Sequence, residues 1–198
     1  MLNLDQLKED LKTILAKRRP KRIKGNGTDY THASVLLPLF VRDGQYWILF
    51  TKRTGTVEYH KGEVSFPGGV VDKDDTSLEG TAKRETFEEI GVREEDIEIM
   101  GQLDDMPTMS SRFIIHPFVG VVPFPYAFTI NNKEVENLIE VPLGVFLDPS
   151  QPQPFSINHE GQVVETSAFI YQGVVIWGAT ERILENFINL IRPTMQRP

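Results

Sequence analysis

Three glutamates with helical spacing are the residues of this sequence best suited to chemistry. Glu85, Glu88 and Glu89 occupy positions i, i+3 and i+4. On an α-helix, Glu88 and Glu89 would each lie within about 60° of Glu85 on one face. Hard oxygen ligands favour Mg²⁺ or Mn²⁺, and these ions typically join one or two carboxylates to substrate phosphates. The spacing therefore indicates a divalent ion and a phosphate-containing ligand.

Two glycines and an arginine accompany this pattern. The sequence Phe66-Pro67-Gly68-Gly69 comes before the glutamates, and its glycines let the backbone turn sharply and bring a carbonyl near the same ion. Arg84 can pair with Glu88 at i+4 or with a neighbouring carboxylate, and such a pair would hold that carboxylate in place.

A helix predicted from Thr76 to Ile90 would carry the glutamates. Thr76 and Glu79 form a capping-box pattern at its start, and Gly91 stands where a C-terminal glycine cap belongs. Upstream, two segments rich in β-forming residues flank Asp43-Gly44, which is a strong hairpin signal. These segments, 34–40 and 46–51, are predicted to be antiparallel strands.

Further elements follow from hydrophobic periodicity. Apolar spacing predicts an amphipathic helix over 2–16, followed by a basic run, 17–24, expected to be a solvated connector unless it contacts a phosphate ligand. The remaining pattern predicts strands over 97–103, 113–122 and 166–176, a short helix over 133–139 and a final helix over 179–191. This mixture indicates an α/β or α+β layered fold, with residues 1–30 as an N-terminal helix and basic connector and residues 31–198 as one domain.

Charge and composition exclude several classes of protein. The 198 residues carry 21 basic and 28 acidic side chains, a net charge of −7, and the segment 72–98 alone accounts for this excess. The acids of that segment outside the three glutamates are expected to be solvated surface. The absence of cysteine excludes disulfides, thiol nucleophiles and thiolate metal sites. The lack of a membrane-length apolar run, of a signal peptide and of clustered basic and aromatic residues predicts a cytoplasmic protein that binds neither membrane nor nucleic acid.

The residues around the glutamates match a known motif. The pattern Gly69-x5-Asp75-x8-Arg84-Glu85-Thr86-x-Glu88-Glu89-x-Gly91-Val92 closely resembles the Nudix box of metal-dependent diphosphate hydrolases, G-x5-E-x7-R-E-U-x-E-E-x-G-U, where U is a bulky aliphatic residue. Asp75 replaces the first Glu, one extra residue precedes Arg84, and Thr86 replaces an aliphatic residue. The R-E-x-x-E-E core is unchanged. The resemblance implies a Nudix fold, an α/β/α sandwich with a central mixed β-sheet.

The departures from the box resemble the coenzyme A diphosphatase branch of this superfamily, whose further signature has the form L-L-T-x-R-S…H-x-G-x-V-x-F-P-G-G. Here the two parts read as residues 49–54 and 60–69, with Thr54 in place of Ser and Val57-Glu58 where the branch tends to have Leu-Arg. The resemblance, which covers roughly residues 34–190, implies hydrolysis of coenzyme A or acyl-CoA to 3′,5′-ADP and 4′-phosphopantetheine or its acyl form. ADP-ribose or a nucleoside triphosphate is the alternative substrate, and a non-catalytic nucleotide-binding module is the alternative of another class.

The resemblance also implies roles for individual residues. Glu85 and Glu89 would be the principal Mg²⁺ or Mn²⁺ ligands, with the Gly68 carbonyl as an additional ligand. Glu88 would be a further ligand or a base acting through a water. A catalytic base outside the box is expected at Glu134 or Glu136, although an exposed glutamate is often merely solvated.

Substrate contacts are expected beside the box. The resemblance places Arg53, His60, Lys61 and Gly69 at the nucleotide, with Arg53 and Lys61 suited to phosphates. For Arg53 an ion pair with a nearby carboxylate is the alternative, and for His60 a structural hydrogen bond. A homodimer is left open, because many relatives form dimers.

Overall fold

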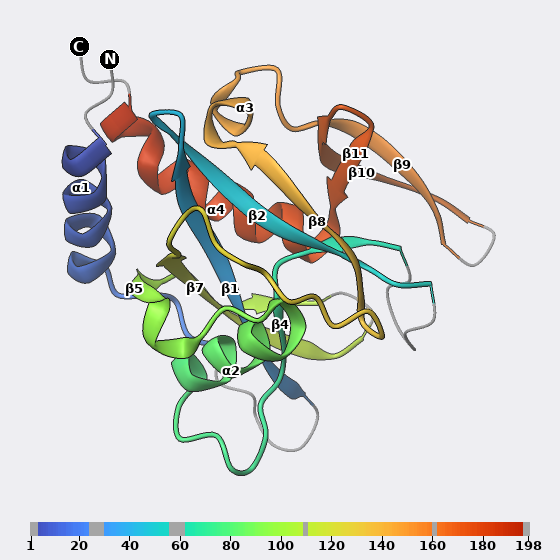
Figure 1. Ribbon diagram of the computed structural model, residues 1–198. Coiled ribbons are helices and arrows are strands. Elements are labelled where there is room, and N and C mark those ends of the chain that lie inside the picture. The colour runs from blue at the N-terminus through green and yellow to red at the C-terminus, as the bar shows by residue number, and fades with distance from the viewer. Residues whose placement is uncertain (1–3, 24–29, 56–61, 109–110, 160–161, 196–198) are drawn as a thin grey trace.

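A computed structural model describes residues 4–23, 30–55, 62–108, 111–159 and 162–195 (Figure 1). Four α-helices and eleven strands are assigned within these ranges. In chain order the elements are α1 (Leu4–Lys17), β1 (Thr31–Arg42), β2 (Gln45–Arg53), β3 (Val64–Ser65), β4 (Gly68–Val70), α2 (Leu78–Ile90), the 3₁₀ turn η1 (Glu94–Asp96), β5 (Glu98–Gln102), β6 (Met106–Pro107), β7 (Phe113–Val121), β8 (Val135–Pro142), α3 (Leu143–Leu147), β9 (Gln153–His159), β10 (Gln162–Tyr171), β11 (Val174–Trp177) and α4 (Gly178–Met195).

The central sheet is mixed, as expected from the sequence. Its main order is β3-β2-β1-β7-β5, with β8 on β2, β4 on β1 and β6 on β7. Strands β1 and β7 run parallel, whereas β2 is antiparallel to β1 across the predicted hairpin. Asp43 and Gly44 both have positive φ, 51° and 72°, which is the backbone that a type I′ turn requires.

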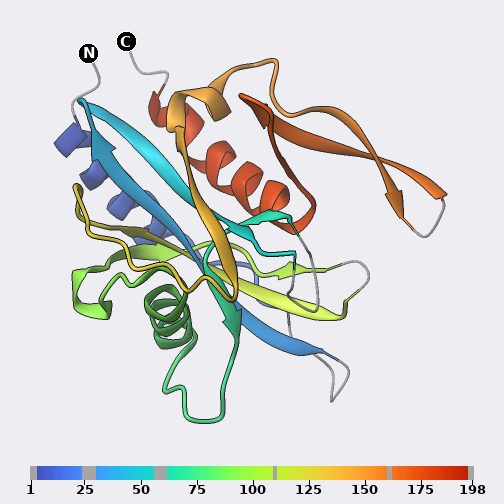
Figure 2. The ribbon, with the colours of Figure 1, turned by 45° about the vertical axis from the view of Figure 1, so that its right-hand side comes forward.

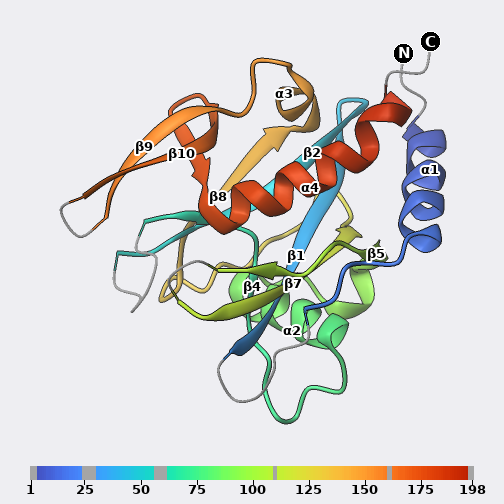
Figure 3. The ribbon, with the colours of Figure 1, turned by 180° about the vertical axis from the view of Figure 1, so that it is seen from behind.

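Helices cover both faces of this sheet. Alternate residues of β1 point to opposite faces, so Leu36 and Phe40 pack with Ala82 and other residues of the α2 side, whereas Leu37 joins the core beneath α1 and α4. Figure 3 shows α4 crossing the face opposite α2. The protein is therefore an α/β/α sandwich, which confirms the predicted fold class.

The N-terminal helix and its connector are bound to the domain. Leu7, Leu11 and Leu15 of α1 are buried in the same core as α4, and Lys8 and Lys12 both pair with Glu98 at 2.6 Å. Glu98 belongs to the acidic segment that was expected to be solvated surface, and its side chain is 43% exposed, so it is a surface residue that also anchors α1.

The basic connector is also less solvated than expected. Arg18 Nη2 lies 2.5 Å from Asp104 Oδ1, and Arg22 Nη1 lies 3.2 Å from the buried carboxylate of Asp105. The backbone joins in, because the Asp105 N–H donates to the Lys21 carbonyl. The partners lie more than 80 residues apart in the chain, so the sequence carries no local sign of this docking.

Two predicted elements differ from the structure. The segment predicted as a short helix, 133–139, is largely strand β8, which pairs with β2 from Trp47↔Pro142 to Arg53↔Val135. Its apolar residues fit either period, and pairing with a buried strand favours the extended form over helix propensity. The strand predicted over 166–176 is two strands, β10 and β11, joined by a turn at Gln172-Gly173 with φ values of 48° and 81°.

Strands β9, β10 and β11 form a second, three-stranded sheet, and the β9–β10 hairpin extends away from the central sheet (Figure 2). Among the described residues, the helices include none that is long and apolar enough to span a membrane.

Candidate metal-binding and catalytic site

Helix α2 has well-defined ends that fix the positions of its glutamates. Ser77 is the N-cap, because its Oγ accepts a hydrogen bond from the Gly80 N–H at 3.0 Å. The predicted capping box of Thr76 with Glu79 is therefore wrong by one residue, and Glu79 instead pairs with Lys83 at 3.1 Å. At the other end Gly91 has φ 74° and donates its N–H to the Phe87 carbonyl, as the predicted glycine cap requires.

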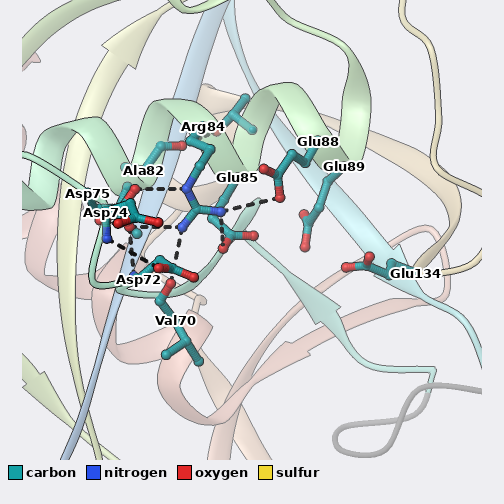
Figure 4. Close-up of polar contacts among 12 residues, drawn as sticks. Val70, Asp72, Asp74, Asp75, Ala82, Arg84, Glu85, Glu88, Glu89 and Glu134 are labelled. Atoms are coloured by element: carbon teal, nitrogen blue, oxygen red, sulfur yellow. Dashed lines mark hydrogen bonds and ion pairs between the residues drawn. The ribbon is translucent and has the colours of Figure 1, made fainter.

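Arg84 ties the helix to the loop before it (Figure 4). Its Nε and Nη2 atoms lie 2.8 and 2.9 Å from the two carboxylate oxygens of Asp75, a bidentate pair. The guanidinium holds the pKa of Asp75 well below its usual range. Nη1 of Arg84 also donates to Glu85 at 2.8 Å and to Glu88 at 3.2 Å. The predicted Arg84–Glu88 pair is present, but Asp75 is the stronger partner.

Glu89 is the most unusual of the three glutamates, because its carboxyl group is buried and only 2% of the residue is exposed. Burial raises the pKa of Glu89 to about 8, the Arg53 cation and a Gly68 backbone hydrogen bond oppose this shift, and the nearby Glu85 and Glu134 carboxylates add to it. Nη1 of Arg53 lies 3.8 Å from Glu89 Oε1. Among the described residues, Oε2 of Glu89 has no hydrogen-bond partner.

The two glycines of β4 allow the backbone to approach these carboxylates. A Cβ atom at Gly69 would lie 2.5 Å from the Glu85 carboxylate, so only glycine leaves room for it there. Gly68 has φ 155°, and a Cβ atom at this position would meet the Ser34 carbonyl oxygen at 2.4 Å. The strand pairing of β4 with β1 thus sets Gly68 and Gly69 against the face of α2 that carries Glu85 and Glu89.

The chemistry of these groups fits a divalent ion such as Mg²⁺ or Mn²⁺. All the donors are oxygens, and a buried carboxylate oxygen without a partner, such as Glu89 Oε2, is costly unless a cation or a proton compensates it. The described residues include no group of three acidic or histidine side chains already placed to hold an ion. Arg84 pairs with both Glu85 and Glu88. Glu88 is half exposed and Glu85 is mostly covered.

The two candidate bases outside the helix lie in different surroundings. Burial is the main cause of the raised pKa of Glu85 and of Glu89, and the nearby charge of Glu134 adds to both; Figure 4 shows the Glu134 carboxylate pointing toward Glu89. Glu136 lies on β8 and pairs with Lys52 at 2.9 Å. The structure therefore brings Glu134, and not Glu136, to the glutamates of α2.

Of the residues predicted to contact the substrate besides Gly69, the structure describes only Arg53. Arg53 stands beside Glu89, as described above. His60 and Lys61 lie outside the described residues. The sequence did not single out Asn131, which hydrogen-bonds Glu134, although the turn-forming run Asn131-Asn132-Lys133 immediately before a glutamate was a usable signal.

Comparison with protein-family models matches residues 30–157 to the NUDIX domain. Two curated relatives share the name "Uncharacterized Nudix hydrolase NudL". The protein from Photorhabdus laumondii is 33% identical over 173 residues, which cover 87% of this chain and 90% of the relative. The protein from Enterobacter sp. (strain 638) is 36% identical over 152 residues, 77% of this chain and 78% of the relative.

Solved structures are similar in fold. A MutT/nudix family protein from Enterococcus faecalis superposes with a TM-score of 0.56 and 15% identity, covering 96% of this chain and 75% of that one. At this identity the likeness concerns the fold alone.

Proposed function

Because the chain belongs to the Nudix hydrolase family, we propose that it is a divalent-metal-dependent diphosphatase whose substrate is coenzyme A or an acyl-CoA. The products would be 3′,5′-ADP and 4′-phosphopantetheine or its acyl form. The substrate proposal rests on the resemblance of residues 49–54 and 60–69 to the coenzyme A diphosphatase signature. The reaction class rests on one observation above all: the Glu89 carboxylate is buried beside Glu85 and Gly68, and its Oε2 has no hydrogen-bond partner in the part of the chain that the structure describes.

Glu85, Glu89 and the Gly68 carbonyl would hold Mg²⁺ or Mn²⁺, with Glu88 as a further ligand. A bound ion of this kind neutralises diphosphate charge and lowers the pKa of a water. Arg84 keeps Glu85 and Glu88 on the side of α2 that faces Val70, because it is itself anchored by Asp75. Arg53 and Gly69 would contact the substrate, and a guanidinium next to the carboxylates suits a diphosphate.

Glu134 is the base that we propose outside the helix. Its carboxylate is exposed, and it lies close enough to Glu85 and Glu89 to influence both electrostatically. A carboxylate in this position can accept a proton from a water that attacks phosphorus. Glu136, on β8, is held by an ion pair with Lys52 of β2 and serves as the matched comparison.

A substrate panel tests the proposal. The purified protein would be incubated with Mg²⁺ or Mn²⁺ and coenzyme A, acetyl-CoA, ADP-ribose or nucleoside triphosphates, and the products separated by chromatography. We expect 3′,5′-ADP from the coenzyme A substrates at the highest kcat/KM. Negligible turnover of coenzyme A beside ADP-ribose or a nucleoside triphosphate would refute the substrate but leave the reaction class intact.

Two pairs of variants test the site. Glu89→Gln should remove most of the turnover and the metal response, whereas Glu95→Gln, on the exposed η1 turn, should not. Glu134→Gln should lower kcat, whereas Glu136→Gln should leave it nearly unchanged. A protein that binds nucleotide tightly but turns over none of these substrates, with or without Glu89, would instead be a non-catalytic binding module.

A further inference from the structure

The segment between β7 and β8 is hydrogen-bonded to the C-terminal turn of α2, the turn that carries Glu88 and Glu89. The Asn131 N–H donates to the Glu89 carbonyl at 2.9 Å, and the Thr129 N–H donates to the Ile90 carbonyl at 3.0 Å. Gly91 makes this approach possible, since a Cβ atom there would lie 2.8 Å from Thr129 Cβ. The position of Asn131 is therefore fixed relative to the backbone of Glu89.

Asn131 also determines the conformation of the residues that follow it. Its carbonyl accepts the Glu134 and Val135 N–H groups at 3.0 and 2.9 Å, and its side-chain Oδ1 accepts the Lys133 N–H at 3.2 Å. From the end of β2, the Thr54 N–H donates to the Glu134 carbonyl at 2.9 Å. The backbone of Glu134 is thus held from two sides.

One hydrogen bond remains, and it reaches the Glu134 side chain itself. Nδ2 of Asn131 donates to Glu134 Oε1 at 3.1 Å. Figure 4 shows the Glu134 carboxylate pointing toward Glu89. Glu134 is exposed and has three rotatable side-chain bonds, so without a contact its carboxylate would also sample directions away from Glu89.

We propose that Asn131 is a positioning residue for catalysis, which holds the Glu134 carboxylate toward Glu89 through its Nδ2 while its backbone is anchored on the Glu89 carbonyl. The amide engages one carboxylate oxygen, Oε1, and we assign proton acceptance to the other, Oε2. This inference rests on the proposed role of Glu134 as the base. A general base must lie within hydrogen-bond reach of the proton it takes, so a small displacement of Glu134 is expected to lower kcat strongly.

Asn131→Asp separates this role from a purely structural one. Aspartate has the same shape and keeps an oxygen to accept the Lys133 N–H, but it replaces the Nδ2 donor by an acceptor that repels Glu134. Asn132→Asp is the matched control, because it adds the same charge at an exposed neighbouring position. Asn131→Ser, which retains an acceptor oxygen but cannot reach Glu134, replaces the aspartate variant if that protein fails to fold.

The experiment is a double-mutant cycle on the full chain with coenzyme A as substrate, or with whichever diphosphate of the panel is turned over. Asn131→Asp should lower kcat by roughly 10- to 100-fold, with the KM, the apparent Mg²⁺ affinity and the melting temperature close to wild type. In a Glu134→Gln background the same substitution should cause no further loss, because the group that it positions is already inactive. Asn132→Asp should retain the wild-type kcat.

The outcomes distinguish the inference from the function on which it rests. If Glu134→Gln lowers kcat and Asn131→Asp does not, the positioning role is refuted and the base assignment stands. If Asn131→Asp lowers kcat equally in both backgrounds, Asn131 acts by another route and the inference is wrong. If Glu134→Gln has no effect, the base assignment fails and the positioning role fails with it.

Discussion

The Glu85 carboxylate lies so close to the backbone of Gly69 that a Cβ atom at position 69 would be 2.5 Å from Glu85 Cδ. Gly69→Ala should therefore displace the carboxylate and leave the fold intact, because Glu85 is a flexible side chain and Gly69 does not require a positive φ. We expect a loss of about tenfold or more in apparent Mg²⁺ affinity, as for other disturbances of metal-ligand orientation. Calorimetric titration with Mg²⁺ or Mn²⁺ measures it.

Gly144→Ala is the control for that prediction. Gly144 lies in α3, and a Cβ atom there would meet no atom within 4 Å. Its metal affinity and activity should equal those of the wild type. An unchanged metal affinity in Gly69→Ala would show that Glu85 is not a ligand or that it can bind from another rotamer.

The Asp75–Arg84 pair yields a prediction for stability. Asp75→Asn leaves the partly buried guanidinium without its bidentate partner, and we expect a loss of about 1–3 kcal/mol in the free energy of unfolding at pH 7. The pKa of Asp75 is lowered in the fold, so its contribution is fully present above the usual pKa of 3.8 and is lost as the pH falls through the folded value. Urea unfolding at pH 7 and at pH 3 should show the difference from wild type shrinking in acid.

Asp74→Asn is the matched substitution, since this neighbouring carboxylate is exposed and makes no ion pair among the described residues. It should change the unfolding free energy by less than about 0.5 kcal/mol. Equal losses in the two variants would mean that charge in this loop, and not the Arg84 contact, provides the stabilisation.

Much of the site could be predicted because its determinants are local in sequence. The i, i+3, i+4 spacing of the glutamates, the glycine cap and the Asp43-Gly44 turn depend on a few adjacent residues, and the structure has all three features. Segment 133–139 failed as a helix because its pairing with β2, more than 80 residues upstream, decides its conformation. The docking of Arg18 and Arg22 is equally non-local.

Asp75 was expected to be solvated surface like the other acids of segment 72–98, and that expectation is wrong, because its side chain is only 8% exposed. Its position in the box was recognised, yet only the fold shows that it anchors Arg84, nine residues away, through both carboxylate oxygens. Glu134 and Glu136 could not be separated by sequence, because their difference depends on which side of β8 and its preceding turn faces α2. In the structure Lys52 pairs with Glu136, whereas the Glu134 carboxylate points toward Glu89 (Figure 4).

His116 and Glu89 should give opposite pH dependences of stability. Burial lowers the pKa of His116 below 6.5. Asp105, 2.8 Å from His116 Nδ1, partly offsets this shift. His32, next to Nε2, and Arg22, which binds the same Asp105, lower the pKa further. Below pH 6.5 the unfolded chain therefore binds a proton at His116 that the folded chain does not, and this uptake destabilises the fold as the pH falls through 6.5. Burial raises the pKa of Glu89 to about 8, so ionisation of this buried carboxyl destabilises the metal-free fold as the pH rises from 4.5 to 8.

Unfolding in urea with a chelator, between pH 5 and 8, separates the effects of His116 and Glu89 on the free energy of unfolding. Relative to wild type, His116→Gln should remove a destabilisation that grows as the pH falls. Glu89→Gln should remove a destabilisation that grows as the pH rises. Each effect on the free energy of unfolding is on the order of a few kcal/mol or less. His32→Gln serves as the comparison at the exposed end of the pair. Slopes that change in the same direction for both variants would contradict the assignment.

Arg53 either binds the substrate phosphates or orients Glu89, and these two hypotheses predict different effects of its removal. Its Nε is buried without a hydrogen-bond partner among the described residues, and its Nη1 lies 3.8 Å from Glu89, too far for a hydrogen bond. If the guanidinium contacts the substrate phosphates, Arg53→Gln should raise KM by roughly 10- to 100-fold, the equivalent of a charge-assisted hydrogen bond. Apparent Mg²⁺ affinity should not weaken, since the substitution removes a cation from beside Glu89. Lys52, the preceding residue of β2, provides the control. Its cation pairs with Glu136, so Lys52→Gln should leave KM near the wild-type value. An unchanged KM together with weaker Mg²⁺ binding in Arg53→Gln would show that the arginine orients Glu89 and does not bind substrate.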